Sequence, residues 1–358
     1  MIAGGGTGGH LFPALAVAEA FLEKDGRHQI LFVGSQKGLE RQVLPKQGFA
    51  LETIEVASLV GKSWRKKIES LLLVSKSLGQ SWRLLRSFQP DLVLGMGGYT
   101  SGPVVLTAWA MGKRTAIHEQ NVIPGVSNKI LGKVVDRVFI SFPETAQFFP
   151  PQKTFCTGNP VRKRFTTPLP RPPAEDKGQF TIFVFGGSQG AHRLNSSMAE
   201  ALPLLADLKE KIRVIHQTGP KDYQQMQEIY AQQGWAAEIY SFLEEIEMAY
   251  ARADLIICRA GASTLFELMA MGKAAILVPF PFAANDHQTL NARALEKAGA
   301  AFLVADGELN GEFLSNLLRK LIKDPAALKE MGKRAAALAK LEAAQNIVEL
   351  CYELVRHG

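Results

Sequence analysis

The sequence predicts an α/β protein made of two doubly wound domains with parallel sheets. Three observations lead to this fold class. First, 358 residues exceed the roughly 100–200 residues of a typical single domain. Second, short continuous runs of Val, Ile, Leu and Phe alternate with helical patterns, which is typical of strands buried on both faces of a parallel sheet. Third, Asp91–Lys113 resembles Asp254–Lys273, because each passes from a buried strand through a glycine-bearing turn into a helix that ends in Met-Gly-Lys.

The expected strands follow from the apolar runs, taken in chain order. The first, Met1–Ala3, is unusually short, which suggests a truncated or misassigned start. The others are Ile30–Val33, Asp91–Leu94, Thr115–His118, Arg137–Ile140, Thr181–Phe185, Val214–Gln217, Asp254–Cys258 and Ala275–Val278. Seven of the 18 prolines lie between Pro150 and Pro173, as expected of a connection between domains. We therefore expect two Rossmann-like domains, 1–160 and 161–340, facing each other across a cleft, with a carboxy-terminal helix at about 341–358 that packs back on the first domain.

Composition excludes several classes of protein. Hydrophobic residues make up 47% and charged residues 21%, which is ordinary for a globular protein and excludes disordered and fibrous chains. The three cysteines, Cys156, Cys258 and Cys351, are far apart, so we expect neither a disulfide framework nor a cysteine zinc site. No signal peptide is readable, and no apolar stretch approaches the ~20 residues that cross a bilayer. We expect a cytosolic protein, or one that lies on a membrane without spanning it.

Most of the positive charge lies in one segment. Residues 61–90 hold seven cations against one acid, Glu69, while the formal charge of the whole chain is +7. A helix over 66–86 would turn five apolar side chains to the core, namely Ile68, Leu71, Leu72, Leu78 and Trp82. It would expose two leucines rimmed by cations, which suits an anionic lipid surface; this patch is Lys66, Leu73, Lys76, Arg83 and Leu84. The alternative is a solvated basic face. Nucleic acid is not expected, because no nucleic-acid module accompanies the segment.

Glycine-bearing turns follow several of the expected strands. Gly4–Gly9 is followed by His10 and then by a helix that begins near Leu11-Phe12-Pro13, so backbone N–H groups there can approach a ligand closely. A dinucleotide site would also need an acid after the second strand, which ends in Gly34-Ser35 instead. A tight turn that binds nothing is the structural alternative. Neither this cluster nor Gly186–Gly190 continues into Lys-Ser or Lys-Thr, so neither is a Walker P-loop.

The second half carries further polar groups at strand ends. Ser188, in the turn after Thr181–Phe185, could offer a hydroxyl to a phosphate. Glu267 lies about one turn inside the helix that follows Asp254–Cys258; its carboxylate could accept both hydroxyls of a ribose, or could simply be a favourable acid near a helix start. No Asp-X-Asp sequence occurs, so a nucleotide sugar would be held by helix ends and arginine without an aspartate-bridged metal.

Six motifs, in this order and spacing, resemble the bacterial N-acetylglucosaminyltransferases that make lipid II, which have the GT-B fold and belong to glycosyltransferase family 28. The motifs are GGGTGGHLFPALAVAE, GMGGYTSGP, HEQN, GNPVR, FGGSQGA and CRAGASTLFE, and the resemblance runs from residue 2 to about 300. It implies inverting transfer of GlcNAc from UDP-GlcNAc to the C4 hydroxyl of MurNAc in undecaprenyl-pyrophosphoryl-MurNAc-pentapeptide (lipid I). It also implies a peripheral location on the cytoplasmic face of the inner membrane, other cell-wall synthesis proteins as candidate partners, and no cofactor.

The resemblance further implies roles for individual residues. The carboxy-terminal domain would hold the donor, with uracil at the backbone of Leu243, ribose at Glu267 and sugar hydroxyls at Gln288. Arg259 would line the nucleotide pocket. The pyrophosphate would be held by the hydroxyl of Ser188 and by the turn of Ala262, Ser263 and Thr264. The amino-terminal domain would position the acceptor with Thr7, Gly8, Gly9, Asn121 and Arg162.

An inverting transfer needs a general base that deprotonates the attacking hydroxyl. His10 is the candidate, because an unperturbed imidazole titrates near neutral pH. Two other roles for His10 stay open, namely orienting the substrate and capping the helix, and Glu119 or an ordered water could be the base instead. The rival functions are another GT-B enzyme that glycosylates a lipid and a UDP-GlcNAc 2-epimerase, which would need no lipid acceptor.

Overall fold

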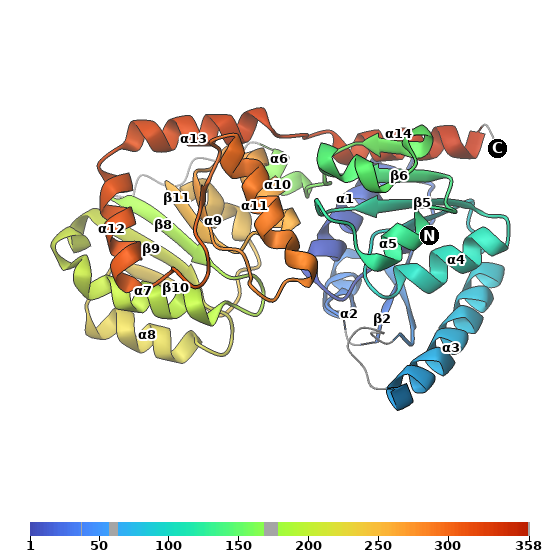
Figure 1. Ribbon diagram of the computed structural model, residues 1–358, viewed down its shortest axis with the longest axis horizontal. Helices are drawn as coiled ribbons and strands as arrows, with labels where there is room; N and C mark the ends of the chain where they lie inside the picture. The colour runs from blue at the N-terminus through green and yellow to red at the C-terminus, as the bar shows by residue number, and fades with distance from the viewer. Residues whose placement is uncertain (37, 57–63, 168–177, 357–358) are drawn as a thin grey trace. The chain divides into compact units, whose positions relative to one another are not determined.

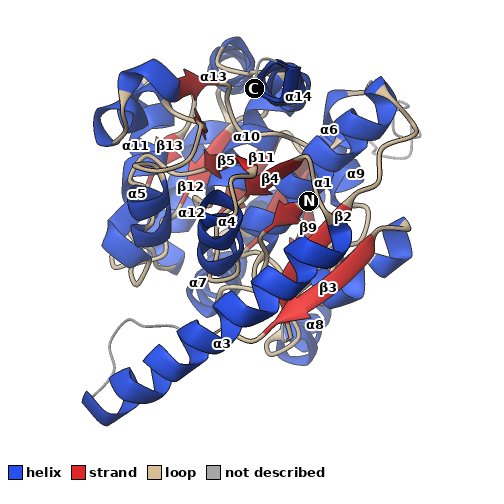
Figure 2. Cartoon of the chain, turned by 90° about the vertical axis from the view of Figure 1, so that its right-hand side faces the viewer, coloured by secondary structure: helices blue, strands red, loops and turns tan. Residues whose placement is uncertain are grey.

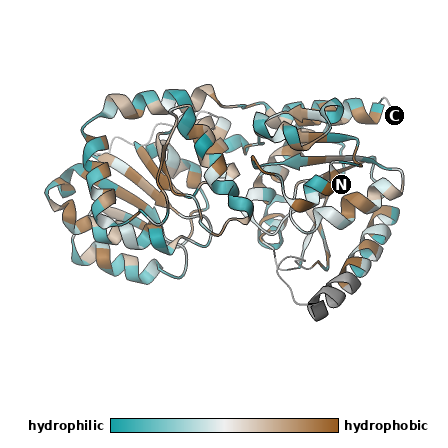
Figure 3. Cartoon of the chain, viewed as in Figure 1, coloured by the Kyte–Doolittle hydropathy of each residue, from teal (hydrophilic) through white to brown (hydrophobic). Residues whose placement is uncertain are grey.

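The computed structural model describes residues 1–36, 38–56, 64–167 and 178–356. The chain divides into two compact units (Figure 1). The first contains Met1–Arg162 and Lys340–Gly358, and the second contains Lys163–Ala339. Each unit is built on a parallel sheet with helices around it, which confirms the predicted fold class. Hydrophobic residues concentrate on the strands of each sheet (Figure 3), as the continuous apolar runs predict.

The described part of the first unit holds a seven-stranded sheet in the order β3-β2-β1-β4-β5-β6-β7. The chain runs outward from β1 to β3 on one side and then from β4 to β7 on the other. β1 is short but central, since Ile2 pairs with both Phe32 and Leu94. The strands are β1 (Ile2–Ala3), β2 (Leu31–Ser35), β3 (Ala50–Ile54), β4 (Leu92–Gly95), β5 (Arg114–Glu119), β6 (Arg137–Ile140) and β7 (Thr154–Cys156).

Helices cover this sheet, and the last helix of the chain belongs to it. α14 packs against α1, and its Ile347, Val348 and Cys351 are buried in the same apolar cluster as Leu11 and Leu15. The helices of this unit are α1 (Gly8–Lys24), α2 (Glu40–Val43), α3 (Trp64–Phe88), α4 (Ser101–Ala110), α5 (Val126–Leu131) and α14 (Ala343–Arg356), with short 3-10 turns η1 (Pro45–Gln47), η2 (Pro143–Phe148) and η3 (Pro151–Lys153).

The described part of the second unit holds a six-stranded sheet in the order β10-β9-β8-β11-β12-β13. Its strands are β8 (Phe180–Phe185), β9 (Ile212–Gln217), β10 (Ala237–Tyr240), β11 (Leu255–Cys258), β12 (Ala275–Leu277) and β13 (Phe302–Leu303). Its helices are α6 (Lys163–Thr166), α7 (His192–Leu204), α8 (Tyr223–Gln232), α9 (Ile246–Arg252), α10 (Ala262–Met271), α11 (His287–Lys297), α12 (Gly311–Ile322) and α13 (Pro325–Ala337), with η4 (Ala206–Lys211) and η5 (Ala284–Asp286).

The described side chains of the basic helix α3, residues 73–88, have a different buried face from the one that the sequence predicts. Ser77, Ser81 and Leu85 are buried, whereas Trp82, expected in the core, is 44% exposed. Leu84, expected on the exposed patch, is half-buried and packs against the apolar cluster of the sheet. Two serines can line the core because each hydroxyl donates to a carbonyl one turn earlier in the same helix.

The lipid-binding patch predicted on α3 is therefore wrong at Leu84. Lys76 and Arg83 are exposed and Leu73 is half-buried, but Leu84 is part of the packing. The side chain of Lys66 lies outside the described residues, as do those of the predicted core residues Ile68, Leu71 and Leu72. Figure 2 shows α3 running beside α4 in this unit. Across the described helices, none is both long and apolar enough to cross a bilayer.

Candidate functional site

The candidate residues of each unit lie at the carboxyl ends of its parallel strands. In the second unit the strand order reverses between β8 and β11, which is the place where open α/β sheets bind ligands. Ser188 follows β8, Leu243 follows β10, and Arg259 begins the turn between β11 and α10. Ala262, Ser263 and Thr264 form the first turn of α10, and Gln288 lies at the start of α11, beyond β12. The structure thus brings the predicted donor residues to one edge of one sheet.

The glycine turn after β8 packs closely on the turn after β9. A Cβ at Gly190 would lie 1.9 Å from the carbonyl oxygen of Thr218, so only glycine fits there. Gln217, which sequence reasoning missed, joins the surrounding loops: its Nε2 donates to the carbonyl of Gly187 at 2.9 Å, and its Oε1 accepts from the backbone N–H of Leu243 at 2.9 Å. The hydroxyl-bearing Ser188 stays exposed beside this bridge.

Glu267 is a buried carboxylate at this edge. It is 7% exposed and accepts a hydrogen bond from the hydroxyl of Tyr250 at 3.2 Å. The ring of Tyr250 lies 5.3 Å from that of Phe165 and 5.7 Å from that of Phe183, so the hydroxyl is firmly placed. α10 begins at Ala262, so Glu267 lies beyond its first turn, and the alternative explanation as a first-turn acid does not hold. Burying a carboxylate is costly unless it is hydrogen-bonded, and the hydroxyl of Tyr250 supplies one such bond to Glu267.

Arg259 and Gln288 hold the loop that follows β12. Nη1 of Arg259 donates to the carbonyls of Val278 and Pro279 at 3.1 and 3.0 Å, and it pairs with Asp306. Its side chain is only 12% exposed and connects the loop after β12 with Asp306. The role that the family resemblance implies for Arg259, lining the nucleotide pocket, stays a prediction. Oε1 of Gln288 accepts from the backbone N–H of Phe280 at 2.9 Å.

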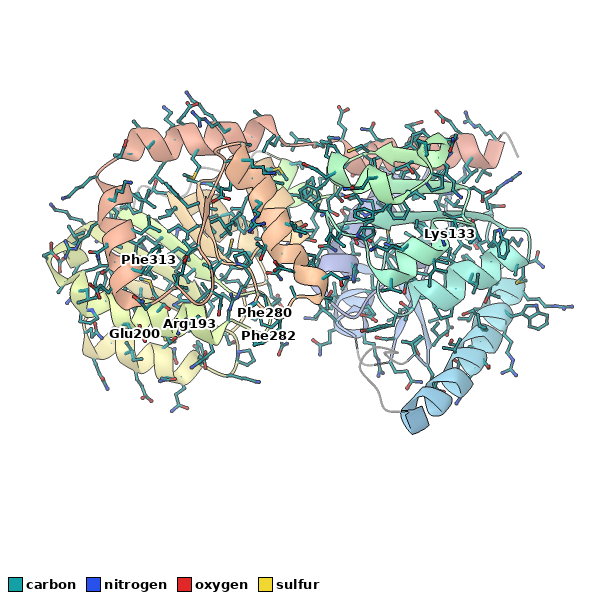
Figure 4. All side chains as sticks on the ribbon, in the orientation of Figure 1. Lys133, Arg193, Glu200, Phe280, Phe282 and Phe313 are labelled. Atoms are coloured by element: carbon teal, nitrogen blue, oxygen red, sulfur yellow. The ribbon has the colours of Figure 1, made fainter. Side chains whose placement is uncertain are left out.

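The loop between β12 and α11 carries two features that the sequence analysis did not single out. Phe280 and Phe282 are 42% and 84% exposed, and Figure 4 labels both on this loop. Asn285 and Asp286 adopt positive φ angles of 54° and 52°, a conformation that Asn and Asp tolerate better than most residues. Exposed aromatic rings and strained backbone on one loop are typical of a ligand-binding segment.

In the first unit, His10 lies in the first turn of α1. Nδ1 of its ring is 3.2 Å from Oε1 of Gln120, which follows β5. The residue that caps α1 is Thr7, which is exposed, so the structure does not assign the cap to His10. Gly8 and Gly9 complete the first turn and are half-buried. His10 therefore stands at the end of the glycine turn, and its ring contacts Gln120 just beyond β5.

A buried carboxylate that the sequence analysis missed supports the glycine turn. Glu40 is fully buried; it accepts from the backbone N–H of Gly6 at 2.8 Å and from the backbone and hydroxyl of Ser35 at 2.7 and 2.9 Å. A Cβ at Gly5 or Gly34 would lie 2.5 Å from the Glu40 side chain. Part of the glycine pattern thus makes room for a side chain of the protein itself, and the amide of Gly6 is already paired with a carboxylate.

Glu119, the alternative base, is fully engaged in holding a loop. Oε1 accepts from the backbone N–H and the Nδ2 of Asn121 at 3.0 and 3.2 Å, and Oε2 accepts from Gly125 N and Asn128 Nδ2 at 3.1 and 2.8 Å. Each oxygen has two acceptor positions, and all four are used. Glu119 is therefore a structural acceptor that places Asn121, which favours His10 as the base.

Arg162 is the last residue of the first unit before α6. It is 9% exposed, and its guanidinium carbon lies 4.1 Å from the centre of the Phe12 ring on α1. A cation over an aromatic face at this distance is attractive. Arg162 is thereby fixed beside the same helix that carries His10. Among the described residues, no group of three or more His, Cys, Asp or Glu side chains could hold a metal ion.

Comparison with known proteins places these features in a family. The chain matches the model of the glycosyltransferase family 28 N-terminal domain over residues 1–140 and that of the family 28 C-terminal domain over residues 181–348. It is 47% identical over 352 residues to a protein of Geotalea uraniireducens, and the match covers 98% of this chain and 96% of that protein. It is 46% identical over 357 residues to a protein of Syntrophus aciditrophicus, and this match covers 99% of this chain and 98% of that protein. Both are named UDP-N-acetylglucosamine--N-acetylmuramyl-(pentapeptide) pyrophosphoryl-undecaprenol N-acetylglucosamine transferase.

Solved structures agree with this assignment. The crystal structure of Acinetobacter baumannii MurG has a TM-score of 0.76 and 33% sequence identity, and the match covers 99% of this chain and 98% of that one. A glycosyltransferase from Rickettsia africae, at 14% identity and a TM-score of 0.67, shares the fold over 100% of this chain and 98% of that one. The resemblance that the six motifs indicate is confirmed. The chain belongs to glycosyltransferase family 28.

Proposed function

We propose that the protein transfers GlcNAc from UDP-GlcNAc to the C4 hydroxyl of MurNAc in lipid I, forming lipid II with inversion at the anomeric carbon. The observation that carries this proposal is the 46–47% identity, over almost the whole chain, to proteins named as that transferase. The local geometry supports it, because the residues expected to bind the donor lie together at the carboxyl edge of the second sheet.

The second unit would hold the donor through groups of known placement. Glu267 would accept hydrogen bonds from the ribose hydroxyls, while the hydroxyl of Tyr250 holds its carboxylate in place. The pyrophosphate would lie at Ser188 and at the amino terminus of α10, where backbone N–H groups and the helix dipole favour negative charge. Uracil would meet the backbone of Leu243, whose amide must then exchange its bond with Gln217 for one with the base.

The first unit would supply the base. The C4 oxygen attacks the anomeric carbon, the bond from that carbon to the β-phosphate oxygen breaks, and UDP leaves with the electron pair. The hydroxyl proton passes to the imidazole of His10. Charge that develops on the departing UDP would be stabilised by the helix end that binds it. Asn121 and Arg162, both fixed by neighbouring groups, would orient the acceptor.

The acceptor is a lipid, so we further propose that the protein lies on the cytoplasmic face of the inner membrane. The supporting surface, here called the α3–α5 face, differs from the patch predicted on α3 alone. It spans α3, α4 and α5, of which α4 contacts both of the others, and each helix exposes at least one large apolar side chain. These are Trp82, Leu106, Trp109, Val126 and Ile130, between 36% and 63% exposed.

Cations border the α3–α5 face. Arg86 lies over the ring of Trp82 at 5.2 Å, Lys129 lies over that of Phe148 at 4.9 Å, and Lys133 is exposed at the end of α5 (Figure 4). Aromatic and aliphatic groups surrounded by Lys and Arg suit the interface of an anionic membrane. Each cation near such a surface contributes on the order of 1 kcal/mol.

One assay separates the proposed transferase from its rivals. Purified protein is incubated with radiolabelled UDP-GlcNAc and a short-chain lipid I analogue, and the label is followed into the lipid fraction. We expect a disaccharide lipid, and undiminished transfer in EDTA, because the chain has no Asp-X-Asp sequence. A soluble labelled sugar released without the acceptor would show an epimerase instead. Labelling of other lipids but not of the analogue would show a different glycolipid glycosyltransferase.

A further inference from the structure

Three side chains of the first unit, His10, Gln120 and His118, form a hydrogen-bonded chain. We propose that Gln120 and His118 are positioning residues that hold His10 in the tautomer with its proton on Nδ1, so that Nε2 carries the lone pair that accepts the hydroxyl proton. This inference rests on the proposed function, in which His10 is the general base. Neither residue needs to touch a substrate, since both act through the ring of His10.

The orientation of the Gln120 side chain follows from a backbone carbonyl. Its Nε2 lies 2.9 Å from the carbonyl oxygen of Met96, which follows β4. A carbonyl oxygen can only accept, so the amide nitrogen must be the atom that faces it. The reversed amide would place two oxygens against each other. With the nitrogen fixed, Oε1 is the atom that faces Nδ1 of His10, at 3.2 Å.

A second carbonyl determines the tautomer of His118. Nε2 of this ring lies 3.1 Å from the carbonyl oxygen of Gly158, so Nε2 must carry the proton. Nδ1 then accepts the second N–H of Gln120, at 3.1 Å. His118 is completely buried, and this burial lowers its pKa to about 4. The ring therefore stays neutral at neutral pH and can act as the acceptor that Gln120 needs.

The state of His10 follows from these two links. Oε1 of Gln120 can only accept, so Nδ1 of His10 must donate, and in the neutral ring the lone pair is on Nε2. Gly97 leaves room for this arrangement: it has a φ of 90°, and a Cβ there would lie 2.7 Å from Nδ1 of His10. Two backbone carbonyls on different strand ends thus determine which nitrogen of His10 can take a proton.

The consequence for catalysis is specific. A ring with its proton on Nε2 could not accept the hydroxyl proton at that atom, so the other tautomer would be inactive in this geometry. The same logic applies to catalytic triads, where a buried carboxylate orients the base. Here the orienting group is a neutral amide. It selects the tautomer without placing a second charge next to the imidazole.

The tautomer is measured directly in the unmodified protein. Histidine labelled with ¹⁵N is incorporated, and nitrogen–proton correlation spectra are recorded at neutral pH, with the His10→Gln spectrum to assign the ring. We expect the Nδ1–H form for His10 and the Nε2–H form for His118. An Nε2–H form for His10 would overturn the inference, whatever the variants below show.

Variants test the link to turnover. Gln120→Met removes the acceptor at similar size. We expect kcat to fall by about 10- to 100-fold, no more than the 10²–10⁴-fold that the general base itself contributes, with KM for UDP-GlcNAc unchanged. In a His10→Ala background the same substitution should cause no further loss of kcat, because Gln120 acts on the reaction only through the imidazole of His10. Gln147→Met, at an exposed glutamine of the same unit, is the control and should match the wild type.

The outcomes distinguish this inference from the function on which it rests. A further loss from Gln120→Met in the His10→Ala background would show that Gln120 acts by another route and would overturn the inference alone. Full turnover of His10→Ala would remove the base assignment, and the inference with it. Loss of transfer to lipid I in the wild type would contradict the proposed function, while the tautomer measured by spectroscopy would still stand or fall by itself.

Discussion

Two buried histidines should make the stability of the protein fall when the pH drops below neutrality. His118 lies in the first unit and His216 in the second, and both are completely buried. His216 is held between the hydroxyl of Tyr230, 3.1 Å from Nδ1, and Oδ1 of Asn195, 3.0 Å from Nε2. Burial penalises the charged imidazole and lowers the pKa of His118 to about 4 and that of His216 to about 3, from an ordinary value of 6.5.

The direction of the effect follows from proton binding. Between the folded and unfolded pKa values the unfolded chain binds more protons, so stability is fully present above pH 6.5 and is lost as the pH falls towards 4. At pH 5, which is about 1.5 units below the pKa of histidine in the unfolded chain, each buried imidazole lowers the free energy of unfolding by about 2 kcal/mol, at 1.36 kcal/mol per pH unit. Glu238 does not add to this window, because hydrogen bonding from Arg252 lowers its pKa to about 2 and its contribution is lost only below pH 4.5.

Urea unfolding at pH 8 and pH 5 measures this difference. Trp235, the only tryptophan in the sequence of the second unit, is buried and reports on that unit. We expect its unfolding free energy to fall by about 2 kcal/mol at pH 5. His216→Gln should lower stability at both pH values and remove most of the difference, whereas the matched control Tyr230→Phe should keep it, since the imidazole stays buried. An equal pH dependence in His216→Gln and wild type would show that burial of His216 is not the cause of the lost stability.

Three further predictions concern the proposed function. His10→Ala should lower turnover by about 10²–10⁴-fold in the transfer assay, and a value within about threefold of wild type would exclude it as the base. Glu267→Gln should weaken UDP binding by about 10- to 100-fold, because a hydrogen bond to a charged group contributes roughly 1.5–3 kcal/mol. Calorimetry should also show that the variant no longer prefers UDP to 2′-deoxy-UDP. An unchanged affinity of the variant for UDP would contradict the ribose role of Glu267. The double variant Trp109→Glu/Ile130→Glu should float less with anionic liposomes than the wild type, whereas Phe313→Glu, in the second unit, should float as the wild type does. Equal flotation of the wild type and both variants would exclude the α3–α5 face as the membrane contact.

The strands that the sequence predicts are those buried on both sides. Each predicted run corresponds to an observed strand, while the four missed strands, β3, β7, β10 and β13, are the four edges of the two sheets. β10 and β13 contain no fully buried residue, and β3 alternates between exposed and partly buried positions until its last residue, Ile54, which is buried. An edge strand has only one protected side, so it lacks the continuous apolar run by which the central strands are recognised.

The buried face of α3 could not be obtained from hydrophobicity alone. Counting apolar residues favours Trp82, but among the side chains of α3 that the structure describes, the buried ones are Ser77, Ser81 and Leu85. A serine in a helix can satisfy its hydroxyl on a carbonyl of the preceding turn and then occupy the core at little cost. Trp82 instead contacts Arg86 on the outside.

The location of the site could be predicted, but its internal support could not. Glycine turns and strand ends indicate where Ser188, Glu267 and His10 lie. The groups that hold them come from distant parts of the chain and carry no local pattern. Glu40 is hydrogen-bonded to Gly6, 34 positions away, and Gln120 is hydrogen-bonded to His10, 110 positions away. Such pairs form only when the sheet brings strand ends together.

The proposed function requires the second unit to hold a uridine diphosphate at the carboxyl edge of its sheet, through helix ends and Glu267 and without a metal. Titration of UDP into the folded protein in the presence of EDTA tests this most directly. We predict saturable heat with one site per chain, abolished by prior addition of UDP-GlcNAc. No detectable binding of either nucleotide to correctly folded protein would contradict the account.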